Sequence, residues 1–125
     1  MVKSVLLVDD NAVIRRVLRQ SFSSEPDLAV CGEAENGQEA IEKATELHPD
    51  LIVMDLAMPV MNGLEAACIL KGLMPTVPLI IFSEYSDALT QEETRSFGIS
   101  AQVSKSAHIS VLIGKMRTLL RDIAA

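Results

Sequence analysis

The chain of 125 residues has no tryptophan, and all its aromatic residues together make up only 3% of the sequence. Hydrophobic residues still account for 49%, so the core must be built from valine, isoleucine, leucine, alanine and methionine. Aliphatic cores are typical of parallel sheets that are covered by helices on both faces. The length suits one compact domain, and we expect residues 1–125 to form a single domain.

Positive charge is scarce and scattered: 11 lysines and arginines face 17 acidic residues, which gives a net charge of −6. Nucleic acids are bound by clustered cations, so we expect no direct contact with them. No apolar run is long enough for a signal peptide or a membrane span, which predicts a cytoplasmic protein that does not bind membranes. Two cysteines are present, Cys31 and Cys68, without metal-ligand spacing, and we predict that both are buried, reduced thiols.

Short apolar runs alternate with segments of helical periodicity. The predicted strands are residues 5–8, 28–31, 51–54, 79–82 and 101–103. A helix is expected after each strand; the fourth, at about residues 86–97, is mostly polar and should be the least firmly docked. Five βα units with right-handed crossovers predict an α/β fold, in which one five-stranded parallel sheet lies between two layers of helices.

Three aspartates follow two of the predicted strands: Asp9 and Asp10 come after the first, and Asp55 comes after the third. Each of them could simply cap a helix, since aspartate is a favoured N-cap residue. If the first and third strands are neighbours, as in one doubly wound order, the three carboxylates converge at one edge of the sheet. Carboxylates that lie so close raise each other's pKa unless a cation is present, and an all-oxygen site with few protein ligands suits Mg²⁺.

Two further polar residues end strands of the same sheet. Ser83 follows the fourth strand and Lys105 closes the fifth. Alone, they could be a surface hydroxyl and an exposed lysine. Beside a metal and a carboxylate, however, a hydroxyl donor and an ammonium group form a cage for a phosphoryl group.

Residues 5–10 (VLLVDD), residues 55–65 (DLAMPVMNGLE), Ser83 and Lys105 together resemble the receiver family of the response regulators of two-component signalling. The resemblance covers essentially the whole chain. It implies the flavodoxin-like strand order 2-1-3-4-5 with five helices.

The resemblance also implies roles for the acidic residues. Asp55 would be the phosphorylation site. Asp10, Asp55 and the backbone carbonyl of Ala57 would bind Mg²⁺, while Asp9 would act mainly through water.

Further roles follow from the same resemblance. Lys105 would pair with the phosphoryl oxygens, and Ser83 would donate a hydrogen bond to the phosphoryl group after transfer. The donor would be a phosphohistidine on a sensor histidine kinase or phosphotransfer protein, and the receiver would catalyse its own phosphorylation and dephosphorylation. The signal would pass to a downstream effector protein or domain through the fourth helix, fifth strand and fifth helix.

Three positions depart from the family pattern. Gln102 stands where an aromatic residue is usual, Glu84 where a small residue usually follows the hydroxyl, and Ser106 where proline usually follows the lysine. A cis bond before a residue other than proline costs about 3–4 kcal/mol, so we predict a trans bond between Lys105 and Ser106.

The remaining polar residues have simpler interpretations. We predict that Arg15 and Arg16 lie on a solvated helix face, that His48 and His108 have surface or capping roles, and that Tyr85 covers a loop.

Two other functions remain possible at this stage. One is a receiver-like adaptor that works without phosphorylation, which Gln102 and Glu84 would favour. The other is a Mg²⁺-dependent phosphatase, which would need a second acid near Asp55 and a substrate cap, and the sequence shows neither.

Overall fold

The computed structural model describes residues 1–84 and 89–124, which alternate between strands and helices. The strands are β1 (Lys3–Val8), β2 (Leu28–Ala34), β3 (Leu51–Met54), β4 (Leu79–Ser83) and β5 (Ala101–Ser104). The helices are α1 (Ala12–Ser23), α2 (Gly37–Leu47), α3 (Gly63–Leu73), α4 (Gln91–Ser96) and α5 (Ile109–Ala124).

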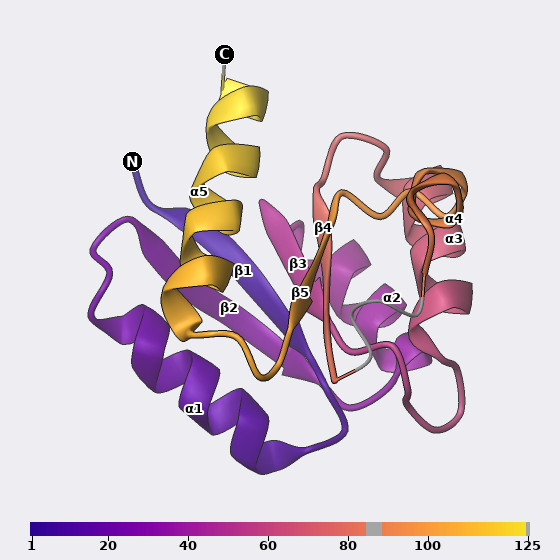
Figure 1. The fold of residues 1–125 in the computed structure, drawn as a ribbon, viewed down its shortest axis with the longest axis horizontal. Helices are drawn as coiled ribbons and strands as arrows, with labels where there is room; N and C mark the ends of the chain where they lie inside the picture. The colour runs from indigo at the N-terminus through magenta and orange to yellow at the C-terminus, as the bar shows by residue number, and fades with distance from the viewer. Residues whose placement is uncertain (85–88, 125) are drawn as a thin grey trace.

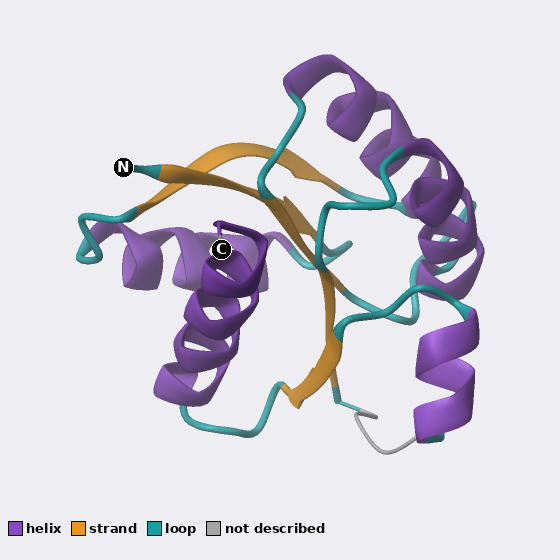
Figure 2. Ribbon diagram, turned by 90° about the horizontal axis from the view of Figure 1, so that it is seen from above, coloured by secondary structure: helices purple, strands orange, loops and turns teal. Residues whose placement is uncertain are grey.

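The strands form one parallel sheet in the order β2-β1-β3-β4-β5, as predicted (Figure 1). Helices α1 and α5 cover one face of this sheet, and α2, α3 and α4 cover the other (Figure 2). The fold is therefore the expected doubly wound α/β sandwich.

The central strands β1, β3 and β4 carry continuous apolar runs because both of their faces are covered. Leu7, Phe22 and Leu112 belong to the core under α1 and α5. Leu6 and Leu70 belong to the core under α2 and α3. Alternate residues of one strand thus supply two separate cores, which fixes the strand between its helix layers.

Polar residues start four of the helices. A side-chain oxygen accepts hydrogen bonds from first-turn amides at four N-caps: Asn11, Asn36, Asn62 and Thr90. Gly63 is required at the start of α3, because a Cβ atom there would lie 2.4 Å from the carbonyl oxygen of Asp55. The Asn62-Gly63 pair thereby lets α3 begin directly against the end of β3.

Helix α4 is shorter than predicted. The expected helix covered about residues 86–97, whereas α4 comprises six residues, Gln91–Ser96, none of which is buried. Residues 86–88 and Tyr85 lie outside the described residues. Thr90 stops the helix from extending further back, because it forms a capping box with Glu93. Gly98, just after this helix, adopts the left-handed conformation with a φ of 74°.

The prediction that both cysteines are buried is wrong for Cys68. Cys31 is half-buried and Cys68 is exposed, and both are free thiols. The buried face of α3 is formed by Gly63, Ala66, Ala67 and Leu70. Cys68 lies one residue beyond Ala67 and is thus turned by about 100° out of that face.

Two other expectations concern the backbone. No cis peptide bond occurs among the described residues, so the predicted trans bond between Lys105 and Ser106 is confirmed. His48 ends α2 in the left-handed conformation, which confirms its capping role. Within the described part of the chain, no helix combines the length and hydrophobicity that crossing a bilayer would require.

Candidate functional site

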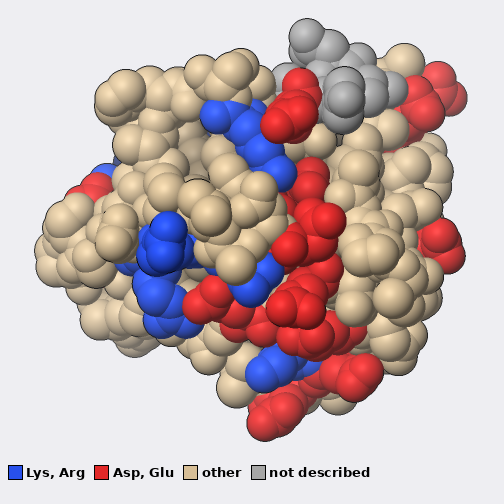
Figure 3. Space-filling model, turned by 90° about the horizontal axis from the view of Figure 1, so that it is seen from below, with Lys and Arg blue, Asp and Glu red and all other residues tan. Residues whose placement is uncertain are grey.

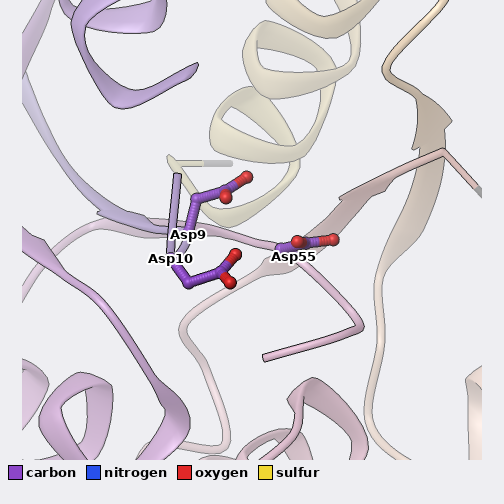
Figure 4. Close-up of side chains that lie close together, drawn as sticks. All are labelled: Asp9, Asp10 and Asp55. Carbon is purple, nitrogen blue, oxygen red and sulfur yellow. The ribbon is translucent and has the colours of Figure 1, made fainter. Parts of the chain in front are cut away.

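The site lies at the edge of the sheet where the parallel strands end. Val8 pairs with Met54 at the last position of the β1–β3 ladder, and the amide of Asp55 donates to the carbonyl of Val8 across 2.9 Å. Asp9 and Asp55, the next residue of each strand, are consequently neighbours. One carboxylate oxygen each of Asp9, Asp10 and Asp55 lies within 4.8 Å of the others, and the three side chains lie close together (Figure 4).

None of the three aspartates caps a helix. The N-cap of α1 is Asn11, and that of α3 is Asn62. Asp9 is 3% exposed, and its Oδ1 accepts a hydrogen bond of 2.9 Å from the amide of Asn11. Asp55 is 7% exposed, and its Oδ1 accepts one of 2.8 Å from the amide of Leu56. The capping explanation is excluded for these residues, and two of the carboxylates are buried.

Lys105 extends from the end of β5 into this cluster. Its Nζ lies 2.7 Å from Oδ2 of Asp9 and 3.2 Å from Oδ2 of Asp55. Burial raises the pKa of Asp9 and outweighs the opposing hydrogen bonds from Lys105 and Asn11. Burial also disfavours the charged form of Lys105, but the contacts with Asp9 and Asp55 together raise the pKa of the ammonium. The lysine therefore remains a cation and partly balances the carboxylates.

A hollow of about 180 Å³ opens beside these groups. Its lining residues are Asp9, Asp10, Asn11, Asp55, Ala57, Ser83, Glu84 and Lys105. Ser83 is 1% exposed and its carbonyl accepts the amide of Lys105 across 3.0 Å, whereas Glu84 is exposed at the rim. Acidic side chains gather on this face of the molecule (Figure 3). Every residue that the sequence assigned to the site thus lines one hollow.

The donor set fits a hard divalent cation. The hollow is lined by the three aspartate carboxylates and that of Glu84 against the one ammonium of Lys105, so its net charge is negative. The oxygens converge within the range that one ion can bridge, and the hollow has room for water ligands, as Mg²⁺ requires.

The sequence interpretation missed one contributor. Arg15 is not on a solvated face: its side chain is 11% exposed, and its guanidinium donates to the backbone carbonyl of Asp9. Its partner Glu33 lies 18 residues further along the chain, on β2. No local pattern signals such a pair, because the contact exists only after β1 and β2 have paired.

Comparison with known proteins agrees with this geometry. The sequence model of the response regulator receiver domain matches residues 5–117. The chain belongs to this family.

Curated relatives of this receiver domain include two protein-glutamate methylesterase/protein-glutamine glutaminases. That of Methanosarcina acetivorans is 42% identical over 96 residues, which are 77% of this chain and 27% of the relative. That of Nocardioides sp. is 37% identical over 120 residues, which are 94% of this chain and 32% of the relative. The chain thus spans only about a quarter to a third of these proteins.

Solved structures show the same fold. The response regulator domain of Thermotoga maritima CheB has a TM-score of 0.89 and 33% identity, covering 97% of this chain and 98% of that domain. The response regulator TrrA of Thermotoga maritima, solved in complex with Mg²⁺ and BeF, has a TM-score of 0.84 and 29% identity, covering 94% of this chain and 98% of TrrA. The acidic pocket of Asp9, Asp10 and Asp55 is typical of a receiver phosphoacceptor site, and a phosphorylation-independent adaptor is not favoured.

Proposed function

We propose that Asp55 accepts a phosphoryl group from a phosphohistidine of a histidine kinase or phosphotransfer protein. The observation that carries this proposal is the position of Asp55: its buried carboxylate lies beside the Asp9-Asp10 pair, and the ammonium of Lys105 contacts both Asp9 and Asp55. An oxygen of Asp55 forms the new P–O bond while the P–N bond of the donor breaks. The imidazole leaves with the electron pair of that bond.

The neighbouring residues stabilise the charge of the transferred group. Lys105 is near enough to Asp55 for its ammonium to pair with a phosphoryl oxygen, and the Ser83 hydroxyl donates to another. Asp10, Asp55 and the Ala57 carbonyl would hold Mg²⁺, with Asp9 acting mainly through water. The ion, when bound, supplies positive charge to the phosphoryl oxygens. We further propose that residues 1–125 form one receiver domain that controls an effector protein or domain.

Phosphorylation of Asp55 can be tested directly. Incubation with phosphoramidate and Mg²⁺ should add one phosphoryl group to the wild type, and mass spectrometry should place it on Asp55. The Asp55→Asn variant should take up none. Asp27→Asn is the matched control, because Asp27 does not line the hollow, and it should be labelled like the wild type. Stoichiometric labelling of Asp55→Asn would refute the assignment.

A further inference from the structure

Arg15 connects the acidic end of β1 to the end of β2. It lies in α1 four residues after the N-cap Asn11, and its guanidinium makes three contacts. Nη1 donates to the carbonyl of Asp9, Nε donates to Oε1 of Glu33 across 2.8 Å, and Nη2 lies 3.8 Å from Glu35. Arg15 does not line the hollow, and its contact with a residue of the site is the hydrogen bond to the carbonyl of Asp9.

The carbonyl of Asp9 belongs to the peptide group that joins Asp9 to Asp10. The other polar groups of Asp9 are already engaged: its amide donates to the carbonyl of Ala34 across 3.0 Å, and its side chain accepts from Asn11. The guanidinium completes this set and fixes the plane of the Asp9–Asp10 peptide. A backbone carbonyl facing a charged, nearly buried donor is held more firmly than one facing water.

Asp10 depends on that peptide plane. Asp10 is exposed, and among the described residues its side chain makes no hydrogen bond or ion pair of its own. The only restraint on this side chain is therefore the direction of its Cα–Cβ bond, which depends on the backbone that Arg15 contacts.

Glu33 keeps the guanidinium in position. Its Oε1 contacts Arg15, and its Oε2 contacts Arg19 at 2.8 Å. Although burial alone would raise the pKa of Glu33, the two arginines outweigh it and hold that pKa below its usual value. Glu33 consequently stays ionised and orients the planar fork of Arg15, which an ammonium group could not match.

We infer that Arg15 is a positioning residue for the cation half of the phosphoacceptor site. It fixes the Asp9–Asp10 peptide, aims the carboxylate of Asp10 and thereby sets the affinity for the divalent cation. This inference rests on the proposed function.

Removal of Arg15 distinguishes two effects on Mg²⁺ affinity: the loss of a contact that positions Asp10 and the loss of a positive charge near the site. Loss of a cation near three carboxylates would by Coulomb's law strengthen Mg²⁺ binding. Loss of a positioning contact should weaken it, by about 10-fold or more for outer-shell partners of metal ligands. The two explanations therefore predict opposite signs for Arg15→Ala.

The experiment compares the Mg²⁺ dissociation constants of wild type, Arg15→Ala, Arg15→Lys and Arg16→Ala by calorimetry. Arg16 is the matched control, since it is the exposed neighbour on the same helix. We expect about 10-fold weaker binding for Arg15→Ala, a smaller loss for Arg15→Lys and less than about a 2-fold change for Arg16→Ala. In metal-free protein, NMR should show larger shifts of the Asp10 and Asn11 amides in Arg15→Ala than in Arg16→Ala.

The inference is overturned if a folded Arg15→Ala binds Mg²⁺ as tightly as Arg16→Ala, or more tightly. If Arg15→Ala does not fold, Glu33→Gln takes its place: it should weaken Mg²⁺ binding while the guanidinium remains, and unchanged affinity would overturn the inference. Asp10→Asn separates the two proposals. If wild type and Asp10→Asn bind Mg²⁺ equally, the proposed metal site itself is wrong; if only Asp10→Asn loses binding, the site stands and the role of Arg15 falls.

Discussion

The side chains of the pocket show which kinds of contact a sequence can reveal. Asp9, Asp55 and Lys105 were predictable, because each directly follows a strand and strand ends meet at one edge of a parallel sheet. The ion pairs of Lys105 with both aspartates were not, since their geometry depends on packing around the pocket. Arg15 was misread for the same reason: its partner Glu33 becomes a neighbour only in the folded sheet.

Glu33 leads to a prediction about acid stability. The folded state holds the pKa of Glu33 below the unfolded value of 4.5. Its contribution to the free energy of unfolding is therefore present above pH 4.5 and is lost as the pH falls through the folded pKa. The side chain is 32% exposed, which limits the contribution to about 0.5 kcal/mol.

Urea unfolding between pH 7 and pH 3 tests this effect. We expect the difference in the free energy of unfolding between wild type and Glu33→Gln to decrease below pH 4.5. Glu42→Gln serves as the control for the loss of one exposed carboxylate. An increase of this difference at lower pH would contradict the ion pairs of Glu33 with Arg15 and Arg19.

At the level of elements, α4 shows where periodicity fails as a guide. The predicted strands match the observed ones to within a residue or two, apart from β2, which extends three residues further. Apolar runs buried on both faces define such strands clearly. Helix α4 buries no residue, so its length is set by the capping box of Thr90 and Glu93, and a hydrophobic pattern cannot reveal it.

One polar contact joins β5 to the residue before the N-cap of α4. Gln102 on β5 donates from Nε2 to the carbonyl of Leu89 across 3.2 Å, while its buried Oε1 has no hydrogen-bond partner among residues 1–84 and 89–124. A buried acceptor without a donor costs about 1–3 kcal/mol. The contact of β5 with the start of α4 is therefore weak, and α4 should move at little cost.

Phosphorylation should move this part of the fold. We predict that a beryllofluoride phosphoryl mimic shifts the backbone NMR signals of residues 92–102 as well as those of Asp9, Asp10, Asp55, Ser83 and Lys105. Moving a two-state equilibrium almost completely from one state to the other takes about 5.5 kcal/mol of differential stabilisation. Because Gln102 stands where an aromatic residue is usual, we expect only part of the population to change state and the signals to shift by only part of the full difference.

Gln102→Leu provides the comparison for this measurement. It removes the hydrogen bond to Leu89, and we expect the response of residues 92–102 to shrink while the pocket signals still shift. If beryllofluoride shifts only the NMR signals of the pocket residues in the wild type, the pocket is not coupled to α4, and the adaptor hypothesis is favoured.

For the whole molecule, the carboxylate cluster links stability to the cation. Without metal, mutual repulsion of the carboxylates lowers the stability of the fold, and Asp10→Asn relieves part of it. Mg²⁺ that binds only the folded state stabilises it by about 1.4 kcal/mol at ten times its dissociation constant.

Thermal unfolding should therefore show a crossover. In EDTA, Asp10→Asn is expected to melt about 2–4 °C above the wild type. Added Mg²⁺ should raise the wild-type Tm by about 4–6 °C and leave that of Asp10→Asn nearly unchanged. Equal responses of the two proteins to Mg²⁺ would contradict a cation site at Asp10.

The pocket draws its side chains from the ends of four different strands, and 46 residues separate Asp9 from Asp55 while 50 separate Asp55 from Lys105. Among the described residues, no single βα unit contains the whole reaction centre. If the proposed function holds, we expect the chain to accept no phosphoryl group during biosynthesis until β5 has joined the sheet. Only molecules that have completed their folding would then be phosphorylated, so that phosphorylation would report a correctly folded domain.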